Sequence, residues 1–401
     1  MFICLRVSMN IAIFTNNYFP NPYGVTQSIE SFRKYFETQG HSVFIFAPRY
    51  KEYKDSNPRV FRFPSIDITY KFRFPLPMPY SRHITKELEK MNIDIIHAQH
   101  PVFLGIAAKK WAIKKNIPLV FTWHTLYDHY VHFVPFVPQK VAIRWIIKKA
   151  TTYANACDHI IVPTQSIIPI LRSWGVTNKN ISAIPTGVEE KTYQNANGAI
   201  IREMYAMKED DIVLFLNARL TKEKNVEFLF RSIVPILKKN RKVKLLVVSG
   251  GDLEAKLKKF MEKNQVSLQT IFAGVVQKEK IKHYYAAGDI FVYASKSETQ
   301  GMIISEAMYM GLPVVAVRAT GVSDLVKNNM SGILVAEDQN EFTTAVEKLI
   351  ANDILRVQFS IAAKKIAQRE YVSAVSGEKM MKVYEQAIER KKNKELVTSN
   401  R

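Results

Sequence analysis

Short apolar runs separated by amphipathic stretches fill most of the chain. In the first half, runs at 9–14, 41–48, 93–99, 119–125, 159–164 and 181–185 predict short buried strands. Between the first two runs, Ile29, Phe32 and Phe36 recur at helical spacing, and Gly40 ends the predicted helix 26–38. Continuous apolar strands that alternate with helices are typical of a parallel, doubly wound sheet.

A second series follows the polar stretch 189–198, which we interpret as a linker. Its apolar runs lie at 212–218, 243–251, 270–276, 289–295 and 313–317. The sequence therefore predicts an α/β protein of two Rossmann-like domains facing a central cleft, where ligands bind at the carboxyl ends of strands. We expect an N-terminal domain at 1–190, a C-terminal domain at 191–371, a final helix at 372–391 and a disordered tail at 392–401. Met9 is the expected start of the fold, and residues 1–8 are interpreted as an upstream extension.

The chain is strongly basic, with 57 Lys and Arg residues against 36 Asp and Glu residues and a formal net charge of +21. Such a balance predicts an anionic partner, which can be nucleic acid, a phosphorylated substrate or an anionic membrane. The two cysteines, Cys4 and Cys157, fit a reducing compartment and argue against a disulfide framework. No apolar run reaches the ~18 residues of a membrane span, and the N-terminus lacks a signal-peptide pattern.

The segment 295–311 carries two acids around a predicted helix start. Glu298 is expected in the loop after a strand, Gly301 at the helix N-terminus and Glu306 inside the helix. Free N–H groups at that terminus suit sugar or diphosphate oxygens, and the carboxylates suit sugar and ribose hydroxyls. Taken alone, the same pattern also fits a capped helix with ordinary surface acids.

The segment 217–225 places Arg219 and Lys224 directly after a predicted strand. Two cations there can neutralise a diphosphate leaving group, although a solvated basic loop has the same pattern. Gly250 and the pair Gly274-Val275 also follow strands, and each fits either a plain turn or a backbone contact to a nucleotide. Dinucleotide, P-loop and HExxH fingerprints are absent, and so is the Asp-x-Asp metal handle.

Histidines are concentrated in the first 200 residues, but their spacing does not predict a metal site. The five considered as ligands are His97, His100, His124, His129 and His132. They lack helical or finger-like spacing and cysteine support. His124 stands out because it ends a predicted buried strand at the cleft. We therefore predict no metal ligands.

The order of these segments resembles family 4 of the retaining glycosyltransferases, which have the GT-B fold. The resemblance covers nearly the whole chain and is carried by NYFPNPYGVTQSI (17–29), IPTGV (184–188), ARLTKEKN (218–225), SGGD (249–252), FAGVV (272–276) and SETQGMIISEAMYMGLPVVA (297–316). It implies that the N-terminal domain binds the acceptor, that the C-terminal domain binds a nucleotide sugar, and that the final helix crosses back to the first domain.

The resemblance also implies roles for individual residues. The catalytic set is Arg219, Lys224, Glu298 and His124, of which Arg219 and Lys224 hold the donor pyrophosphate. The donor-binding set is Gly24, Val25, Gly250, Val275, Gln300, Gly301, Met302, Ile303 and Glu306. Glu298 and the backbone of 300–303 hold the sugar, Glu306 holds the ribose and Val275 lies by the base. The resemblance also implies retention of the α-configuration. No carboxylate is placed as a nucleophile, so we predict front-face attack, without a tightly bound cofactor and with Mg²⁺ at most stimulatory.

Two segments of the N-terminal domain suit an anionic bilayer. Residues 49–86 interleave basic and aromatic side chains, and residues 138–157 contain no acid. In the second segment Lys140, Arg144 and Lys148 share one helix face, with Trp145 beside them. The alternative is that the aromatic residues are core and the cations are solvated.

The segments FTWHTLYDHYVHFVP (121–135) and SETQGM (297–302) resemble the bacterial 1,2-diacylglycerol 3-alpha-glucosyltransferases. This resemblance implies transfer of α-glucose from UDP-glucose to diacylglycerol by a cytoplasmic protein peripheral to the inner face of the membrane. Family members with other acceptors, such as phosphatidylinositol, polysaccharide or small soluble molecules, remain alternatives. A non-catalytic basic protein that binds nucleic acid or membrane is the alternative from another class. No nucleic-acid module is recognisable, so we expect no nucleic-acid partner.

Overall fold

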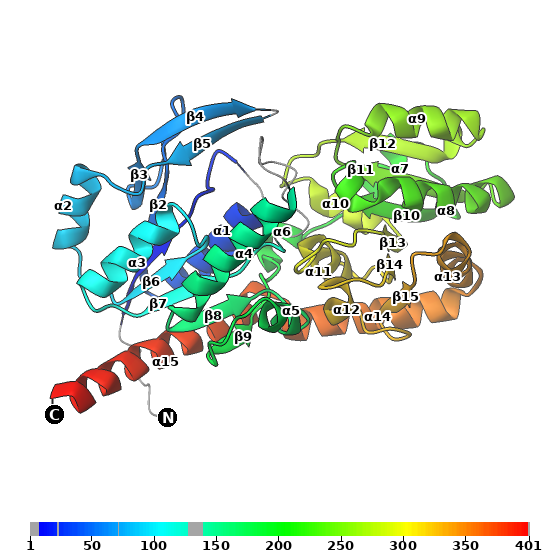
Figure 1. The fold of residues 1–401 in the computed structure, drawn as a ribbon. Helices are drawn as coiled ribbons and strands as arrows, with labels where there is room; N and C mark the ends of the chain where they lie inside the picture. Colours follow the sequence, from blue (N-terminus) through cyan, green and yellow to red (C-terminus); the bar gives the residue numbers. More distant parts are fainter. Residues whose placement is uncertain (1–7, 22–23, 71, 127–138, 400–401) are drawn as a thin grey trace. The chain divides into compact units, whose positions relative to one another are not determined.

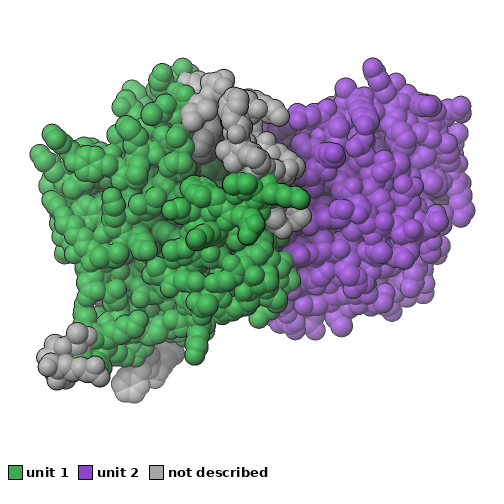
Figure 2. Space-filling model, viewed as in Figure 1, with its two compact units in different colours: residues 1–186, 376–401 green, residues 187–375 purple. Residues whose placement is uncertain are grey.

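The computed structural model describes residues 8–21, 24–70, 72–126 and 139–399. The chain forms two compact units, shown in Figure 2: unit 1 comprises residues 1–186 and 376–401, and unit 2 comprises residues 187–375. Within the described residues, no helix is both long and apolar enough to cross a membrane.

Unit 1 is built on a parallel sheet whose strands are paired in the order β3-β2-β1-β6-β7-β8-β9. The strands are β1 (Asn10–Phe14), β2 (Ser42–Pro48), β3 (Val60–Phe63), β6 (Ile95–Ala98), β7 (Leu119–Thr122), β8 (His159–Val162) and β9 (Ile181–Ala183). The strand order reverses direction between β1 and β6, which is the doubly wound arrangement. An antiparallel hairpin of β4 (Ser65–Tyr70) and β5 (Phe72–Pro77) is added to the unit.

Helices cover both faces of this sheet (Figure 1). One face packs on α2 (Arg82–Lys90), α3 (Leu104–Lys114), α4 (Gln139–Asn155) and α5 (Ile167–Ser173). The other face packs on α1 (Gly24–Thr38) and on α15 (Ser373–Ser399). Successive side chains of β1 point to opposite faces of the sheet. Ile11 and Ile13 belong to the core on the side of α1 and α15, whereas Ala12 and Phe14 belong to the core on the side of α2, α3, α4 and α5.

Unit 2 repeats the design with a parallel sheet in the order β12-β11-β10-β13-β14-β15. Its strands are β10 (Ile212–Asn217), β11 (Val243–Val248), β12 (Thr270–Gly274), β13 (Ile290–Tyr293), β14 (Val314–Val317) and β15 (Gly332–Val335). Its helices are α6 (Glu190–Tyr193), α7 (Ala199–Met204), α8 (Val226–Lys239), α9 (Glu254–Lys263), α10 (Ile281–Ala287), α11 (Met302–Tyr309), α12 (Val322–Leu325), α13 (Gln339–Ala351) and α14 (Asp353–Glu370). The predicted α/β fold with two doubly wound units is confirmed.

The end of the chain differs from the expectation. The sequence predicts a disordered tail at 392–401, but α15 continues to Ser399. Lys392, Lys394, Glu395 and Leu396 are all good helix formers, so the helix extends beyond its packed part although these residues are exposed. Helix α15, orange to red in Figure 1, begins at the end of unit 2 and contributes residues 376–399 to unit 1.

Candidate active site

In unit 2 the strand order reverses between β10 and β13, and ligands of doubly wound sheets bind at such a switch point. The loop after β10 carries Lys224 in a 3-10 turn, and the loop after β13 carries Glu298. Lys224 Nζ lies 2.5 Å from Glu298 Oε1, and both side chains are largely buried. Two charged residues that the sequence predicts for catalysis are thus in direct contact.

Glu298 is held as an ionised carboxylate. Tyr293 Oη and Ser295 Oγ donate hydrogen bonds to the same Oε1 atom, at 2.6 and 2.9 Å. Burial alone would raise the pKa of the Glu298 carboxyl, but the Lys224 charge and these hydrogen bonds hold that pKa below its usual value. The bonds from Lys224, Tyr293 and Ser295 all end on Oε1, so the second oxygen, Oε2, is the one that can accept a hydrogen bond from a ligand hydroxyl.

Arg219 lies on the same loop as Lys224 but is paired with an acid. Its Nη2 atom lies 2.5 Å from Glu223 Oε1, four residues along the chain, and the guanidinium is half exposed. An arginine has five N–H donors, so the remaining ones can face an anionic ligand. Any diphosphate that binds Arg219 must compete with Glu223.

Helix α11 begins where the sequence predicts a ligand-binding terminus. Gly301 is its N-cap and has a φ of 82°, a left-handed conformation that favours glycine. Gln300 is buried before it, and Met302 and Ile303 form the partly buried first turn. The free N–H groups of such a turn favour negatively charged oxygens.

Glu306 lies one turn into α11, within a cluster of tyrosines. Tyr285 Oη donates a hydrogen bond to Glu306 Oε2 at 2.7 Å, and Tyr193 donates a second one. Burial raises the pKa of the Glu306 carboxyl, although both hydrogen bonds act in the opposite direction. Asn217 Nδ2, at the end of β10, donates in turn to Tyr285 Oη at 3.0 Å.

The other predicted donor loops of unit 2 are hydrogen-bonded side by side. Leu220 N donates to Gly250 O at 2.9 Å, and Ser249 N donates to Gly274 O at 2.8 Å. Val275 is 85% exposed at the edge of this set. The loops that contain Arg219, Gly250 and Val275 therefore form one continuous rim.

Several residues that shape this site are not predicted by the sequence. The buried hydroxyls Thr221 Oγ1 and Ser297 Oγ have no hydrogen-bond partner among the described residues. The two hydroxyls lie in the loops that carry Lys224 and Glu298, where a bound water or ligand can satisfy them. Gly321 has a φ of 76°, and a Cβ there would lie 2.6 Å from the Glu298 carbonyl oxygen. The only sequence signal for it is a glycine shortly after a strand.

In unit 1, Gly24 and Val25 form the first turn of α1, immediately after the loop that follows β1. A Cβ at Gly24 would have open space around it. The buried hydroxyl of Thr26 has no hydrogen-bond partner in the described chain.

His124 lies just beyond β7 and is neutral. Its Nε2 atom is 2.6 Å from Gln99 Oε1. Burial, with smaller effects from His100 and His97, lowers the pKa of His124 to about 3. His129 and His132 lie outside the described residues. In the part of the chain that the structure describes, no group of three or more histidine, cysteine or acidic residues could hold a metal ion.

Helix α4 presents the predicted basic face to solvent. Lys140, Arg144 and Lys148 are all exposed, and Trp145 is 57% exposed with the Lys149 Nζ atom 5.9 Å from its ring centroid. The opposite side of the helix is core, with Ala150, Tyr153 and Ala154 buried against the sheet.

The basic-aromatic stretch 49–86 differs from the prediction, because part of it is internal. Arg62 binds Asp55 at 2.6 Å and donates to the carbonyl oxygens of Phe19 and Pro48. Its guanidinium lies 5.5–5.7 Å from the ring centroids of Tyr18, Tyr50 and Tyr53. This cation is therefore a structural centre of unit 1 and cannot face a bilayer. Ile66, Met78 and Tyr80 remain exposed.

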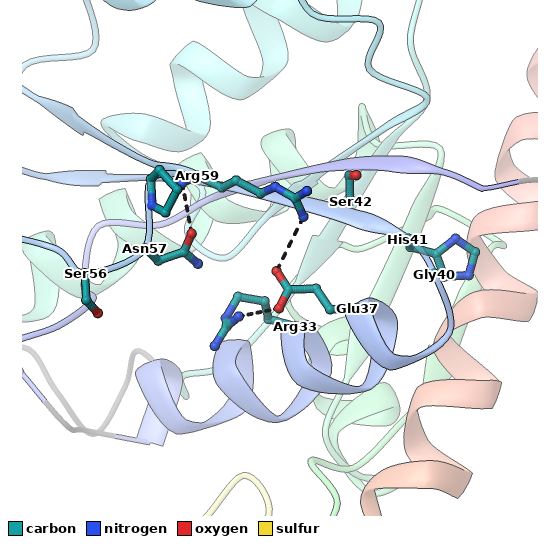
Figure 3. Close-up of a pocket in the computed structure, with 9 residues that line it drawn as sticks. Arg33, Glu37, Gly40, His41, Ser42, Ser56, Asn57 and Arg59 are labelled. Atoms are coloured by element: carbon teal, nitrogen blue, oxygen red, sulfur yellow. Dashed lines mark hydrogen bonds and ion pairs between the residues drawn. The ribbon is translucent and has the colours of Figure 1, made fainter.

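A second feature of unit 1 is an open hollow of about 700 Å³ between the end of α1 and the start of β3 (Figure 3). Arg33 and Arg59 both approach Glu37, at 2.5 and 3.9 Å. Arg33 also binds Glu30 at 2.7 Å. The cations of this hollow are therefore neutralised by the protein itself.

Family models match both halves of the chain. Residues 22–192 match the model described as Glycosyltransferase Family 4, and residues 199–366 match the model described as Glycosyl transferases group 1. The chain belongs to the family 4 glycosyltransferases. The family predicted from the motifs is thereby confirmed.

Two relatives of this glycosyltransferase are named alpha-monoglucosyldiacylglycerol synthase. The one from Streptococcus pneumoniae is 29% identical over 86% of this chain and 79% of its own length, and the one from Acholeplasma laidlawii is 27% identical over 82% and 86%. A GDP-mannose-dependent alpha-mannosyltransferase from Corynebacterium glutamicum is 26% identical over 88% of this chain and 84% of its own length. By their names, the relatives therefore differ in the sugar that they handle, glucose in the first two and mannose in the third.

Solved structures support the fold. Anabaena HepE in complex with UDP and glucose aligns with a TM-score of 0.75 and 16% identity, over 94% of this glycosyltransferase and all of that chain. Sucrose-phosphate synthase from Thermosynechococcus elongatus aligns with a TM-score of 0.76 and 17% identity, over 94% and 98%. These neighbours are glycosyltransferases of the GT-B fold.

Proposed function

We propose that this glycosyltransferase moves glucose from UDP-glucose to diacylglycerol, with retention of the α-configuration. The observation that carries the proposal is the buried contact between Lys224 and Glu298 at the switch point of unit 2. It pairs a cation suited to a diphosphate with a carboxylate whose second oxygen is available to a sugar hydroxyl. The named relatives from Streptococcus and Acholeplasma support the acceptor and the sugar.

The donor is proposed to lie along the rim of unit 2. Arg219 and Lys224 would stabilise the charge that develops on the departing UDP. Gln300, Gly301, Met302 and Ile303 would offer backbone N–H groups, and Glu306 would accept from the ribose. The orphan hydroxyls of Thr221 and Ser297 support a ligand at this place.

For the chemical step we propose front-face attack, in which the leaving phosphate helps to take the proton of the acceptor hydroxyl. No carboxylate is assigned as a nucleophile. His124 would contribute as a neutral imidazole, since burial lowers its pKa to about 3. We propose that the transfer needs no tightly bound metal and that Mg²⁺ at most stimulates it. Complete and metal-reversible loss of activity in chelator would contradict this point.

The acceptor is proposed to be reached from the inner face of the cell membrane, to which the protein binds peripherally. The exposed cations of α4 and the half-exposed Trp145 support this. A soluble or phosphatidylinositol acceptor is the alternative, and GDP-mannose is the alternative donor because mannosyltransferases are among the relatives.

The test is transfer from a panel of UDP-sugars and GDP-mannose to diacylglycerol, phosphatidylinositol and soluble sugars. We expect product with UDP-glucose and diacylglycerol, and an α-linkage by NMR. The matched control is Glu298→Gln, which keeps the shape of the side chain and removes its charge. A β-linked product would refute retention, a trapped glycosyl-enzyme adduct would refute front-face attack, and product with a soluble acceptor alone would refute the lipid acceptor.

A further inference from the structure

A hollow of about 300 Å³ lies in unit 2 between the ends of helices α8 and α9. It is lined by Lys238, Arg241, Lys263, Asn264 and Gln265. Arg241 comes just before β11, so the hollow lies at the amino ends of the strands. The candidate active site of this unit lies after the carboxyl ends of β10 and β13, at the opposite edge of the sheet.

The three cations that line this hollow have no ion pair within the described chain. Lys238 Nζ donates to the amide oxygen of Asn264 at 3.1 Å, and Arg241 Nη1 donates to the amide oxygen of Gln269 at 3.4 Å. Both partners are neutral, and no carboxylate lines the hollow. The positive charge is therefore concentrated in one concave place without compensation.

Neighbouring lysines of the same surface are compensated. Lys239 pairs with Glu347 at 3.0 Å, Lys242 with Asp210 at 2.6 Å and Lys244 with Asp211 at 3.8 Å. The larger hollow of unit 1 also neutralises its arginines, through Glu37 (Figure 3). The excess of basic residues in this protein therefore does not by itself explain why three cations around one hollow have no ion pair within the described chain.

Helix ends offer a simpler explanation for part of the cluster. Lys238 and Lys263 lie in the last turns of α8 and α9, where a cation stabilises the negative end of the helix dipole. This explanation does not extend to Arg241, which lies outside both helices, or to the two amide side chains. The combination is a fork-shaped donor, two point charges and neutral amides around a cavity, and this is the chemistry that recognises phosphate.

We propose that this hollow binds a phosphate group. The ligand is either a soluble phosphate compound or the head group of an anionic lipid, since both present the same oxygens. Leu268, three residues after Gln265, is 92% exposed in the turn Ser267–Gln269. An exposed apolar side chain this close along the chain to the lining residues favours the lipid, because it can enter the interface that the cations attract. The inference does not depend on the proposed transferase reaction.

The experiment compares two triple variants with the same loss of charge. The hollow variant is Lys238→Gln, Arg241→Gln and Lys263→Gln, and the control variant is Lys239→Gln, Lys242→Gln and Lys244→Gln. Binding of inorganic phosphate and of glycerol 3-phosphate is measured by calorimetry. Co-sedimentation is measured with phosphatidylcholine vesicles with and without phosphatidic acid. We expect the hollow variant alone to weaken binding by about tenfold, because charge-assisted hydrogen bonds are lost.

The outcomes identify the source of the phosphate. A loss with the soluble anions supports a soluble ligand, and a loss with phosphatidic acid vesicles alone supports a lipid head group. In the second case Leu268→Ser should weaken vesicle binding as well. Equal effects in the two triple variants, or no effect in the hollow variant, would overturn the proposal.

Two controls keep the result interpretable. Urea unfolding followed by circular dichroism checks that the hollow variant is folded, and a variant with Lys238→Arg and Lys263→Arg should retain binding. Sugar transfer to acceptor dispersed in neutral detergent should be unchanged in the hollow variant. A failure of the proposed transferase activity would appear in wild type and leave the phosphate comparison intact.

Discussion

At the residue scale, Arg219 is occupied by Glu223 in the structure, and the two are exposed enough for solvent to weaken their attraction. We predict that Glu223→Gln lowers the KM for the sugar nucleotide by about two- to fivefold, because exposed ion pairs are worth at most ~1 kcal/mol. Turnover at saturation should change little. Glu347→Gln, which breaks the exposed pair with Lys239, is the matched control. An unchanged or higher KM would show that Glu223 does not compete with the donor.

The two cations of this loop should differ in what their loss does. Arg219→Ala and Lys224→Ala should each lower kcat by a factor of about 10² or more, as expected for one contact to the charge of the transition state. Lys224→Ala should in addition destabilise unit 2, because it leaves the buried Glu298 without its counter-charge. Steady-state kinetics and urea unfolding by circular dichroism measure the two effects. Near-wild-type rates in both variants would reject their assignment.

The site residues that can be predicted from the sequence are charged side chains that come shortly after a predicted strand. Lys224 and Glu298 are found in this way. Thr221 and Ser297 are not, because a hydroxyl becomes informative only when the fold buries it without a partner. The role of Gly321 cannot be predicted from the sequence for a similar reason. Its close approach to Glu298 brings together two loops that are separate in the sequence.

At the element scale, the same limit explains the stretch 49–86. Composition cannot distinguish a cation that faces lipid from one enclosed by tyrosines, and Arg62 is of the second kind. Strands and helices are predictable because apolar periodicity is a local property. Whether a basic helix face is exposed depends on what the rest of the fold packs against, which the local pattern does not show. The basic face of α4 is exposed, as predicted, because the apolar side of this helix packs on the sheet.

Helix α4 carries the third prediction. Changing Lys140, Arg144 and Lys148 to Glu should release the protein from anionic vesicles, since each cation near such a surface contributes about 1 kcal/mol. Co-sedimentation across a salt series measures this, and wild-type binding should fall as salt rises. The matched control changes Lys110, Lys114 and Lys115, the exposed lysines at the end of α3, to Glu. If wild type binds neutral and anionic vesicles equally, the electrostatic model fails.

Buried histidines near the strands of unit 1 give the fourth prediction. Burial lowers the pKa of His97 to about 3 and that of His100 and His159 to about 4. The unfolded chain takes up protons on these groups near pH 6.5, while the folded chain does not. Stability is therefore complete above pH 6.5 and falls as the pH drops toward 4, by up to about 1.4 kcal/mol per pH unit for each histidine.

Urea unfolding between pH 7 and pH 4.5 measures this effect. All four tryptophans, Trp111, Trp123, Trp145 and Trp174, belong to unit 1, so their fluorescence reports that unit alone. His97→Gln should make the dependence on pH shallower, and His83→Gln, at an exposed position, should not. Identical slopes in the two variants would contradict the assignment.

At the scale of the whole molecule, unit 1 is assembled from both ends of the chain. Met380, Met381, Tyr384 and Ala387 of α15 are buried in its core. Tyr384 Oη also lies 2.6 Å from His97 Nδ1. We predict that a chain ending at Val375 loses the folded state of unit 1 and keeps unit 2, because buried side chains of this size contribute about 2–5 kcal/mol each.

Tryptophan emission and the UDP affinity of unit 2 measure these two outcomes. A chain that ends at Lys391 is the matched control, since it keeps the buried residues of α15 and, among the residues whose burial is described, removes only the exposed 392–397. Native tryptophan emission in the shorter chain would show that α15 is dispensable for unit 1.

The split of unit 1 has a consequence for how the chain is made. A ribosome delivers residues 187–375 in one piece, so unit 2 has all of its parts before synthesis ends. Unit 1 begins first but is completed later. Ile11, Ile13 and Phe36 pack in one core with Tyr384, so this core stays incomplete until the segment around Tyr384 has been synthesised. The two units are therefore completed in the reverse of the order in which they begin along the sequence. Until then the N-terminal sheet exposes apolar surface, and such surface is prone to aggregation.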